Sequence, residues 1–238
     1  HNRCRRQRQM CIRDRRDSNL KETITMAISY PKRTLKKSIN RDKLLATTTL
    51  LFSRKGYPDT TLDAVAAEAG VHVQTLYKHF KNKEELAVAA ADLVTRDLEK
   101  RFEEKFASQS TFKIWHSWVK ASVSHITQLG FGEYKKQALH TSTSLIHDNY
   151  LLIIYASYEN ILTEYLGKDF QLDLKTNRLP RLVACMLCSG NEAALKRCAG
   201  QDTDEDVLEY NERVVSESLA VIDDVEKIFA SYVKYPRD

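Results

Sequence analysis

The 238-residue sequence contains few of the residues and residue pairs that interrupt helices. It has only four prolines and seven glycines, and it has no Asn-Gly or Asp-Gly pair, which would favour a tight β-hairpin turn. Alternating stretches typical of strands are scarce, whereas apolar residues recur at helical spacing between the prolines. Each proline stands where a helix would begin or end. These absences predict an all-α fold.

Long apolar runs and regular cysteine frameworks are also absent. No run approaches the roughly 20 apolar residues of a membrane span, and the arginine-rich first residues lack the apolar core of a secretory signal. The five cysteines are odd in number and unevenly spread, unlike the framework of a secreted disulfide-rich domain. We therefore expect a cytoplasmic protein with free thiols and no membrane contact.

The commonest motifs of enzymes, nucleotide sites and metal sites do not occur either. The sequence has no GxSxG, GxGxxG, GxxxxGK[ST] or HExxH, and no two histidines lie four residues apart. Cys185 and Cys188 have the spacing of a redox dithiol, but their apolar helical surroundings lack the positive charge that would activate them. We predict no catalytic site, no metal and no cofactor, and we interpret both cysteines as small buried side chains.

The net charge of +5 is distributed unevenly. We interpret residues 1–31 as a disordered leader, whose string MCIRDR resembles translated sequencing-adaptor DNA, and we assign it no function. Residues 32–83 contain eleven Lys and Arg against four Asp and Glu, whereas residues 84–238 contain eighteen against twenty-five. A compact basic region joined to an acidic one is typical of nucleic-acid binders. Charge alone fits a solvated basic face without a partner equally well.

Three helical patterns fill the basic region. The first covers residues 39–55. The second is short, with Thr60 as its N-cap and Asp63 completing a capping box, and it ends at Gly70. The third covers residues 73–80. Two short helices joined by a glycine-containing turn form a helix-turn-helix, whose second helix enters the major groove of DNA.

A longer series of helices follows. Asn82 is expected to cap a helix that extends to about Phe106, with Glu85 at the reciprocal position of the capping box. Further helices are expected over residues 111–129, 133–146, 149–166, 180–198 and 204–232. The last has two neighbouring apolar columns, a stripe wide enough to pack against its own domain and against a partner subunit. We therefore predict a DNA-binding domain over residues 32–83 and an effector-binding and dimerisation domain over residues 84–238.

The expected third helix has an apolar side and a polar side. Val71, Leu76 and Phe80 hold it against the domain. The opposite side exposes donors and acceptors suited to DNA, because Gln pairs bidentately with adenine, while hydroxyls and lysine bind phosphates. These candidate residues are Gln74, Thr75, Tyr77, Lys78 and His79.

Residues 41–86 resemble the DNA-binding domain of TetR-family transcriptional regulators. The resemblance rests on Phe52, Gly56-Tyr57, Thr60-Thr61-Leu62, Val65-Ala66, Ala69-Gly70-Val71, Thr75-Leu76-Tyr77, His79-Phe80 and Lys81-Asn82-Lys83. It implies that Val73, Gln74, Thr75, Tyr77 and His79 face DNA, and that Thr61 and Lys83 touch phosphates. One departure is His72, which stands where Ser or Thr usually caps the recognition helix and which is a poor N-cap.

The resemblance also implies an effector pocket in the acidic region. Aromatic residues at helical spacing are its candidate lining, although such residues are more often plain core. The candidates are Trp115, Trp118, Tyr134, Tyr155 and Tyr158. The expected partners are a pseudo-palindromic operator in double-stranded DNA, a second copy of the chain, and a small-molecule effector.

Three functions compete at this point. The favoured one is a repressor that a small-molecule effector releases from DNA. The second is a non-transcriptional or architectural DNA-binding protein with the same helix-turn-helix. The third is an enzyme with an accessory DNA-binding region, against which the missing catalytic motifs argue. The sequence does not identify the effector, the operator or the regulated genes.

Overall fold

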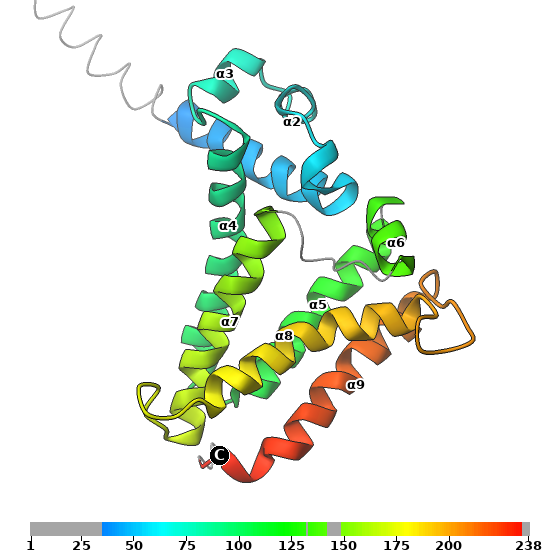
Figure 1. Ribbon diagram of the computed structural model, residues 1–238. Coiled ribbons are helices and arrows are strands. Elements are labelled where there is room, and N and C mark those ends of the chain that lie inside the picture. The colour runs from blue at the N-terminus through cyan, green and yellow to red at the C-terminus, as the bar shows by residue number, and fades with distance from the viewer. Residues whose placement is uncertain (1–34, 132, 142–148, 235–238) are drawn as a thin grey trace, which may run out of the picture. The chain divides into compact units, whose positions relative to one another are not determined.

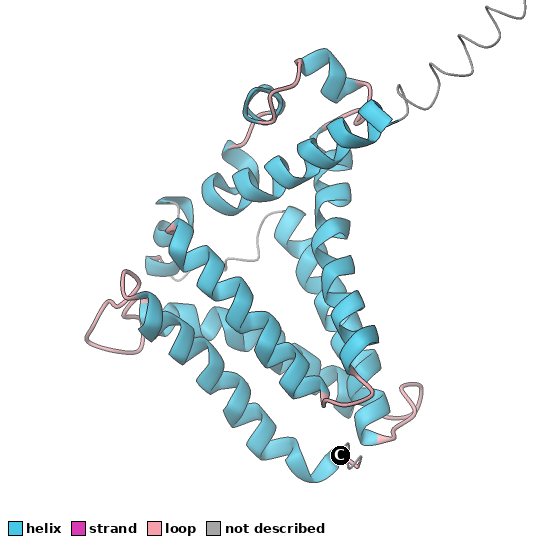
Figure 2. Ribbon diagram, turned by 180° about the vertical axis from the view of Figure 1, so that it is seen from behind, coloured by secondary structure: helices cyan, strands magenta, loops and turns pink. Residues whose placement is uncertain are grey.

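The structure, a computed structural model, describes residues 35–131, 133–141 and 149–234 (Figure 1). Every regular element in these ranges is a helix, and the described residues form no strand (Figure 2). The predicted all-α fold is confirmed. No described helix is both long and apolar enough to cross a membrane. The expected leader over residues 1–31 lies outside the described residues.

The chain forms two compact units, one up to Leu44 and one from Leu45 onward. The described part of the first unit is a helical segment, residues 35–44. The second unit contains the rest of that helix and all later ones. The division at residue 83 into a DNA-binding and an effector-binding domain is a functional one, and it stays a prediction.

The first helix covers residues 35–59, longer at both ends than the expected 39–55. Gly56 has the predicted left-handed backbone, with φ of 81°. The helix nevertheless continues beyond it to residue 59, and the Thr60 hydroxyl donates to the Gly56 carbonyl oxygen at 2.8 Å. Thr60 is therefore buried beneath the end of the first helix.

Three helices follow closely: α2 (Leu62–Glu68), α3 (Val73–Tyr77) and α4 (Lys83–Lys105). The start of α4 was predicted correctly, since the Asn82 side chain accepts a hydrogen bond from the Glu85 N–H at 2.8 Å. The Glu85 carboxylate in turn accepts from the Lys81 N–H at 2.8 Å, one residue before the expected partner. This reciprocal cap fixes where the long helix begins.

The remaining elements are α5 (Thr111–Leu129), α6 (Glu133–His140), α7 (Asn149–Phe170), α8 (Leu179–Cys198), α9 (Asn211–Phe229) and the 3-10 helix η1 (Ala230–Tyr232). The bounds of α5 match the prediction, and α8 starts one residue early. α7 continues four residues beyond its expected end. Of the helix expected over residues 133–146, the structure describes only the part up to residue 141.

The expectation of one helix over residues 204–232 was wrong at its start, because residues 204–210 form a loop. Val207 and Leu208 are buried against the C-terminal end of α8, and the Val207 N–H donates to the Cys198 carbonyl oxygen at 2.7 Å. The Asp206 carboxylate accepts from the Leu208 N–H at 3.0 Å. Tertiary burial of two apolar residues therefore overrides the helical periodicity that they continue.

One apolar core holds α4, α5, α7, α8 and α9 together. In both views α4 lies beside α7, and α8 lies beside α9 (Figures 1 and 2). The largest fully buried side chains of this core are Trp115, Phe102, Phe112 and Phe170. Close approach of α8 to α9 requires Gly190, since a Cβ there would lie 2.5 Å from Cγ1 of Val221.

Candidate DNA-binding surface and internal cavity

The turn between α2 and α3 depends on Gly70, whose φ of 65° disfavours any side chain. Two backbone hydrogen bonds close the turn: the Gly70 N–H donates to the Ala67 carbonyl oxygen, and the Val71 N–H donates to that of Ala66. Leu76, which is fully buried, anchors α3 from the opposite side. The sequence therefore builds two short helices at a set angle, with one face of α3 turned outward.

Both short helices have side-chain caps that differ from the expected ones. Thr61, and not Thr60, caps α2: its hydroxyl oxygen accepts from the Ala64 N–H at 3.1 Å. His72 caps α3, because its Nδ1 accepts from the Gln74 N–H at 3.3 Å. The expectation that His72 is a poor cap was therefore wrong for this tautomer, in which Nδ1 carries no proton.

The candidate DNA-contacting residues occupy two short segments. α3 ends at Tyr77, three residues before its expected end, so Lys78 and His79 lie in the following turn. Gln74, Tyr77 and Lys78 are exposed, with 53% of Tyr77 accessible. Val73, Thr75 and His79 are half-buried. Their polar atoms thus lie on or near one surface, with little apolar area between them.

The two candidate phosphate contacts flank this surface. The exposed Thr61 uses its hydroxyl oxygen as the α2 cap, which leaves the hydroxyl hydrogen able to donate to a phosphate. Lys83 is the first residue of α4. Its Nζ donates to the Pro58 carbonyl oxygen at 3.1 Å and lies 4.3 Å from the centre of the Tyr57 ring. These two contacts fix the position of the Lys83 ammonium group in the DNA-free protein.

A cavity of about 290 Å³ lies among the helices of the second unit. Its wall includes four of the five predicted pocket residues, Trp115, Trp118, Tyr155 and Tyr158. The side chain of the fifth, Tyr134, lies outside the described residues. The remaining lining residues are Thr49, Ser53, Val94, Val119, Ser122, Val123, His125, Ile126, Phe131, Lys135, Leu139, Tyr150, Leu151, Ile154, Asn191 and Leu195.

The cavity wall is mostly apolar and aromatic. The Tyr158 ring packs edge-on against Trp115 and Trp118, with centroids 5.5 and 6.1 Å apart. Burial raises the pKa of Tyr155 and of Tyr158 above the ordinary tyrosine value, so both phenols stay neutral. Arg101 of α4 covers Trp118, with its guanidinium 5.0 Å from the ring centroid. The wall suits an uncharged molecule of modest size.

Two polar atoms of this wall are buried without a hydrogen-bond partner among the described residues. One is the indole Nε1 of Trp115, a residue only 1% exposed, and the other is the carboxamide Oδ1 of Asn191. Buried polar groups are nearly always paired in folded proteins. Because both atoms are fully buried, neither presents accessible surface to the cavity, although their residues border it.

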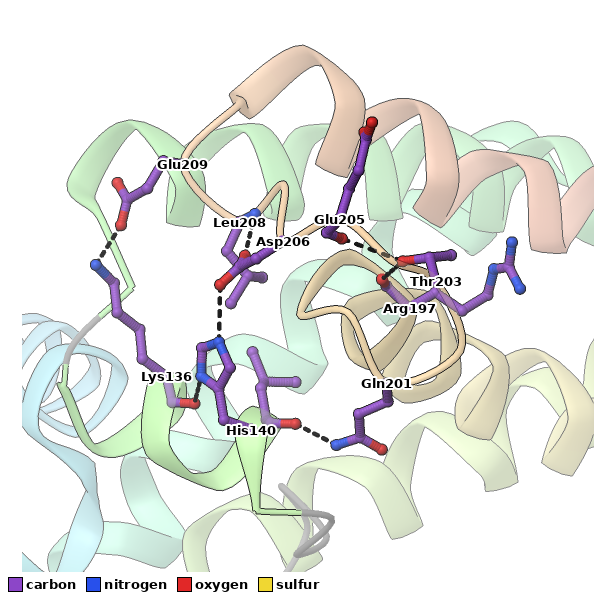
Figure 3. A network of polar contacts seen from close by, with 10 residues as sticks. Lys136, His140, Arg197, Gln201, Thr203, Glu205, Asp206, Leu208 and Glu209 are labelled. Atoms are coloured by element: carbon purple, nitrogen blue, oxygen red, sulfur yellow. Dashed lines mark hydrogen bonds and ion pairs between the residues drawn. The ribbon is translucent and has the colours of Figure 1, made fainter.

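The α6 side of the cavity is held by a polar network, shown in Figure 3. The Nε2 of His140 lies 2.8 Å from a carboxylate oxygen of Asp206, and its Nδ1 lies 2.6 Å from the Lys136 carbonyl oxygen. Lys136 pairs with Glu209, and the Gln201 side chain donates to the Leu139 carbonyl oxygen. Leu139 itself lines the cavity, so the loop between α8 and α9 supports this part of the wall.

The network shifts the pKa values of its two titrating partners in opposite directions. The hydrogen bond to Asp206, followed by that to the Lys136 carbonyl, raises the pKa of His140 above 6.5. The backbone N–H of Leu208 and then His140 lower the pKa of Asp206 below 3.8. The pair is therefore charged over a wider pH range than either group alone.

Neither redox chemistry nor metal binding is supported by the described residues. Burial raises the pKa of Cys188 to about 12 and also raises that of Cys185, so neither thiol is activated. Among the residues that the structure describes, no group of three His, Cys, Asp or Glu side chains could hold a metal ion.

Comparison with known proteins identifies the family. The family model described as "Bacterial regulatory proteins, tetR family" matches residues 44–90, the segment that contains the helix-turn-helix. The segment 44–90 therefore carries the DNA-binding domain that is typical of TetR-family transcriptional regulators. The HTH-type transcriptional regulator TcmR of Streptomyces glaucescens is 24% identical over 144 residues, which are 60% of this chain and 58% of TcmR. The negative transcriptional regulator IcaR of Staphylococcus epidermidis is 41% identical over 46 residues, which are 19% of this chain and 25% of IcaR.

Solved structures agree with the all-helical fold of this chain. The TetR-family regulator SCO4454 of Streptomyces coelicolor superposes with a TM-score of 0.51 and 19% identity, covering 80% of this chain and 96% of that one. The matched part of the chain spans well under two thirds of the length of TcmR and of IcaR. The structural likeness therefore establishes the fold.

Sequence reasoning missed several residues of the cavity. Thr49 and Ser53 were not predicted, because they lie on the first helix and only packing brings them to the wall. Asn191 was missed for the same reason, since a single amide in an apolar helix carries no local signal.

Proposed function

We propose that this protein is a homodimeric transcriptional regulator that binds a pseudo-palindromic operator and releases it when a small molecule occupies the cavity. One observation carries the proposal. Thr49 and Ser53, both within the segment that matches the TetR family model, line the cavity together with residues of α5, α7 and α8. A molecule bound there touches the DNA-binding segment and the helical body at the same time.

The proposed DNA contacts divide into bases and phosphates. Gln74 reads a base edge, because its carboxamide can accept from and donate to adenine simultaneously. Thr61 and Lys83 bind phosphates on either side, and Lys83 exchanges its bond to the Pro58 carbonyl for a charged partner. The N-terminus of α4, where the helix dipole favours an anion, begins at Lys83 itself. The other proposed contacts are Val73, Thr75, Tyr77, Lys78 and His79.

Two connections couple the cavity to the DNA-binding surface. Val94 of α4 lines the cavity, and only five residues separate the end of α3 from the start of α4. In addition, Phe52 of the first helix packs edge-on against Tyr150, with ring centroids 4.9 Å apart, and Tyr150 also lines the cavity. A ligand that moves either contact changes where α3 lies, and the operator loses affinity because the groove spacing of DNA is fixed.

Dimerisation is proposed through the outer faces of α8 and α9. α9 buries Val214 and Ile222 in its own core while Ile228 remains 62% exposed, and on α8 Leu182 remains 58% exposed. Exposed large apolar side chains on neighbouring helices supply the area that a partner subunit covers. Two recognition helices then contact half-sites about 34–36 Å apart. The name of IcaR, a negative regulator, supports repression over activation.

The decisive experiment measures operator and effector binding in one system. The full chain is first used to select an operator from random DNA. A compound that raises the melting temperature of the protein is then titrated into the protein by calorimetry, with and without that operator. If the compound releases the operator, each of the two must lower the affinity of the protein for the other by the same factor, typically about 5–150-fold. Equal affinities for every such compound would contradict the effector role, and selection of DNA without inverted symmetry would contradict the dimeric regulator.

A pair of cavity variants sharpens this test. Ser53→Leu fills the part of the cavity that borders the first helix, so it should weaken binding of the compound and preserve binding of the operator. Ser108→Leu makes the same change at an exposed position outside the cavity wall and should leave both affinities unchanged. If the two variants behave alike, Ser53 does not face the bound molecule.

A further inference from the structure

We propose that three packed aromatic rings connect the cavity to Lys83 and position the ammonium group that binds a DNA phosphate. In order from the cavity, the rings belong to Tyr150, Phe52 and Tyr57. The inference deepens the proposed function, since it rests on the cavity being the effector site and on Lys83 binding DNA. It makes Tyr57 a positioning residue for that contact.

Lys83 is the first residue of α4, yet its charged end is held by the end of the first helix. Its Nζ lies 4.3 Å from the centre of the Tyr57 ring and donates to the Pro58 carbonyl oxygen at 3.1 Å. The Tyr57 hydroxyl donates to a carboxylate oxygen of Glu84 at 3.3 Å. A cation over an aromatic face is attracted by the ring quadrupole. The position of the Tyr57 ring therefore affects where the ammonium group lies.

Phe52 links the Tyr57 ring to the body of the protein. Its side chain is 3% exposed, and its ring packs edge-on against Tyr57, with centroids 5.3 Å apart and an interplanar angle of 63°. On a regular helix, residues five positions apart point to different faces. Gly56, whose φ is 81°, lies between the two residues and interrupts the regular geometry. This left-handed residue lets the two rings meet.

The ring of Tyr150 completes the connection at the cavity. Tyr150 belongs to α7 and packs edge-on against Phe52, with centroids 4.9 Å apart and an interplanar angle of 61°. It lines the cavity, as does Ser53, the neighbour of Phe52 in the sequence. Protein interiors are close-packed, so a buried ring that contacts two others cannot shift without displacing one of them. A displacement of Tyr150 should therefore reach Tyr57 through Phe52.

This route differs from a tilt of α4. A tilt moves the backbone of Lys83 together with the rest of that helix. The three rings instead act on the ammonium group through residues of the first helix. Energetic coupling along such a series of contacts is measured by removing its members one at a time.

The Lys83 side chain reports on the three rings without DNA and without a ligand. In proton–carbon correlation spectra of the full chain, the ring current of Tyr57 should shift the Cε protons of Lys83 upfield of those of the other lysines. Lys83→Arg assigns the signal. Tyr57→Leu should abolish the upfield shift, and Tyr57→Phe, which keeps the ring and loses the hydroxyl, should retain it.

A second pair of variants tests the cavity end. Tyr150→Leu should reduce the upfield shift of the Lys83 signal. Tyr165→Leu is the matched control, because it makes the same change on the same helix, in a ring that stacks on Phe102 outside the cavity wall. It should leave the signal unchanged. If Tyr150→Leu does not fold, Phe52→Leu removes the middle ring and should have the same effect.

Operator binding gives the functional readout. Tyr57→Leu should weaken binding to the selected operator about two- to fivefold, the size expected of an exposed cation–π contact. Tyr57→Phe, which retains the ring, should recover most of this loss. In the background of Lys83→Ala, Tyr57→Leu should have no further effect, because the ring acts through the lysine.

Three results would overturn the inference. These are a Lys83 signal that is unchanged in Tyr57→Leu, a signal that responds to Tyr150→Leu no more than to Tyr165→Leu, and additive effects of Tyr57→Leu and Lys83→Ala on operator binding. Failure of the proposed function has a different signature. If the rings control the Lys83 signal and Lys83→Ala binds the operator as the parent does, the connection stands and the phosphate contact fails.

Discussion

The DNA-binding segment and the cavity are built in different ways. In residues 60–85 the caps, the Gly70 turn and the outward-facing side chains of α3 depend on partners a few positions away. The cavity draws its wall from the first helix and from α4, α5, α6, α7 and α8, including residues as far apart as Thr49 and Leu195. Local structure is readable as a motif, whereas a wall assembled from distant segments is not.

The comparison suggests that the two regions can be damaged separately. Leu76 is fully buried behind α3, so Leu76→Ala should lower the free energy of unfolding by about 2–5 kcal/mol and loosen the helix-turn-helix. Operator binding should be lost, whereas a small molecule that binds the cavity of the parent protein should still bind at low temperature. Urea unfolding, with the two binding assays, measures this. Loss of both activities together would show that the regions fold as one cooperative structure.

The helical body should be most sensitive where α8 meets α9. Gly190→Ala places a Cβ 2.5 Å from Cγ1 of Val221, and such overpacking typically costs about 1–3 kcal/mol. The double variant Gly190→Ala/Val221→Ala should recover much of that loss, because the clashing methyl group is removed. Melting temperatures of the three proteins test this. Independent, additive effects would mean that the clash is relieved elsewhere.

Within the DNA-binding segment, base and phosphate contacts should separate. Gln74→Ala should cost about 1–3 kcal/mol on the selected operator and relax discrimination at particular base pairs. Lys83→Ala should weaken all sequences alike and reduce the slope of log K against log salt by about one. Fluorescence anisotropy at several salt concentrations distinguishes the two. Identical behaviour of both variants and the parent would remove both residues from the DNA contact.

The smallest expected effect concerns the network beside the cavity. The pKa of His140 is raised, so its stabilisation is fully present below pH 6.5 and is lost as the pH rises through the folded-state value. The pKa of Asp206 is lowered, so its stabilisation is present above pH 3.8 and is lost as the pH falls through its folded-state value. The pair therefore contributes most between about pH 4 and 6.5.

Both side chains are about half exposed, so this contribution should be roughly 0.2–1 kcal/mol. The free energy of unfolding in urea should fall by that amount between pH 6 and pH 9. His140→Gln does not titrate, and the decrease should disappear from its pH profile. A variant that keeps the full pH dependence would assign it to other groups.

Much of the fold was predictable because helix signals are local. The bounds of α5 and the Asn82 cap of α4 were predicted correctly, since capping side chains and apolar spacing act within one or two turns. The errors have tertiary causes. The Thr60 hydroxyl donates to the Gly56 carbonyl oxygen, and Thr61 caps α2 in its place. Val207 and Leu208 are buried in a loop, so α9 begins later than expected.

The sequence by itself determined the all-α class and the helix-turn-helix, because each depends on contacts within a few residues. Only the tertiary structure decided that Thr49, Trp115 and Asn191 border one cavity. The physical reason is that burial and hydrogen-bond satisfaction depend on which distant helices pack together, and no local pattern encodes that choice.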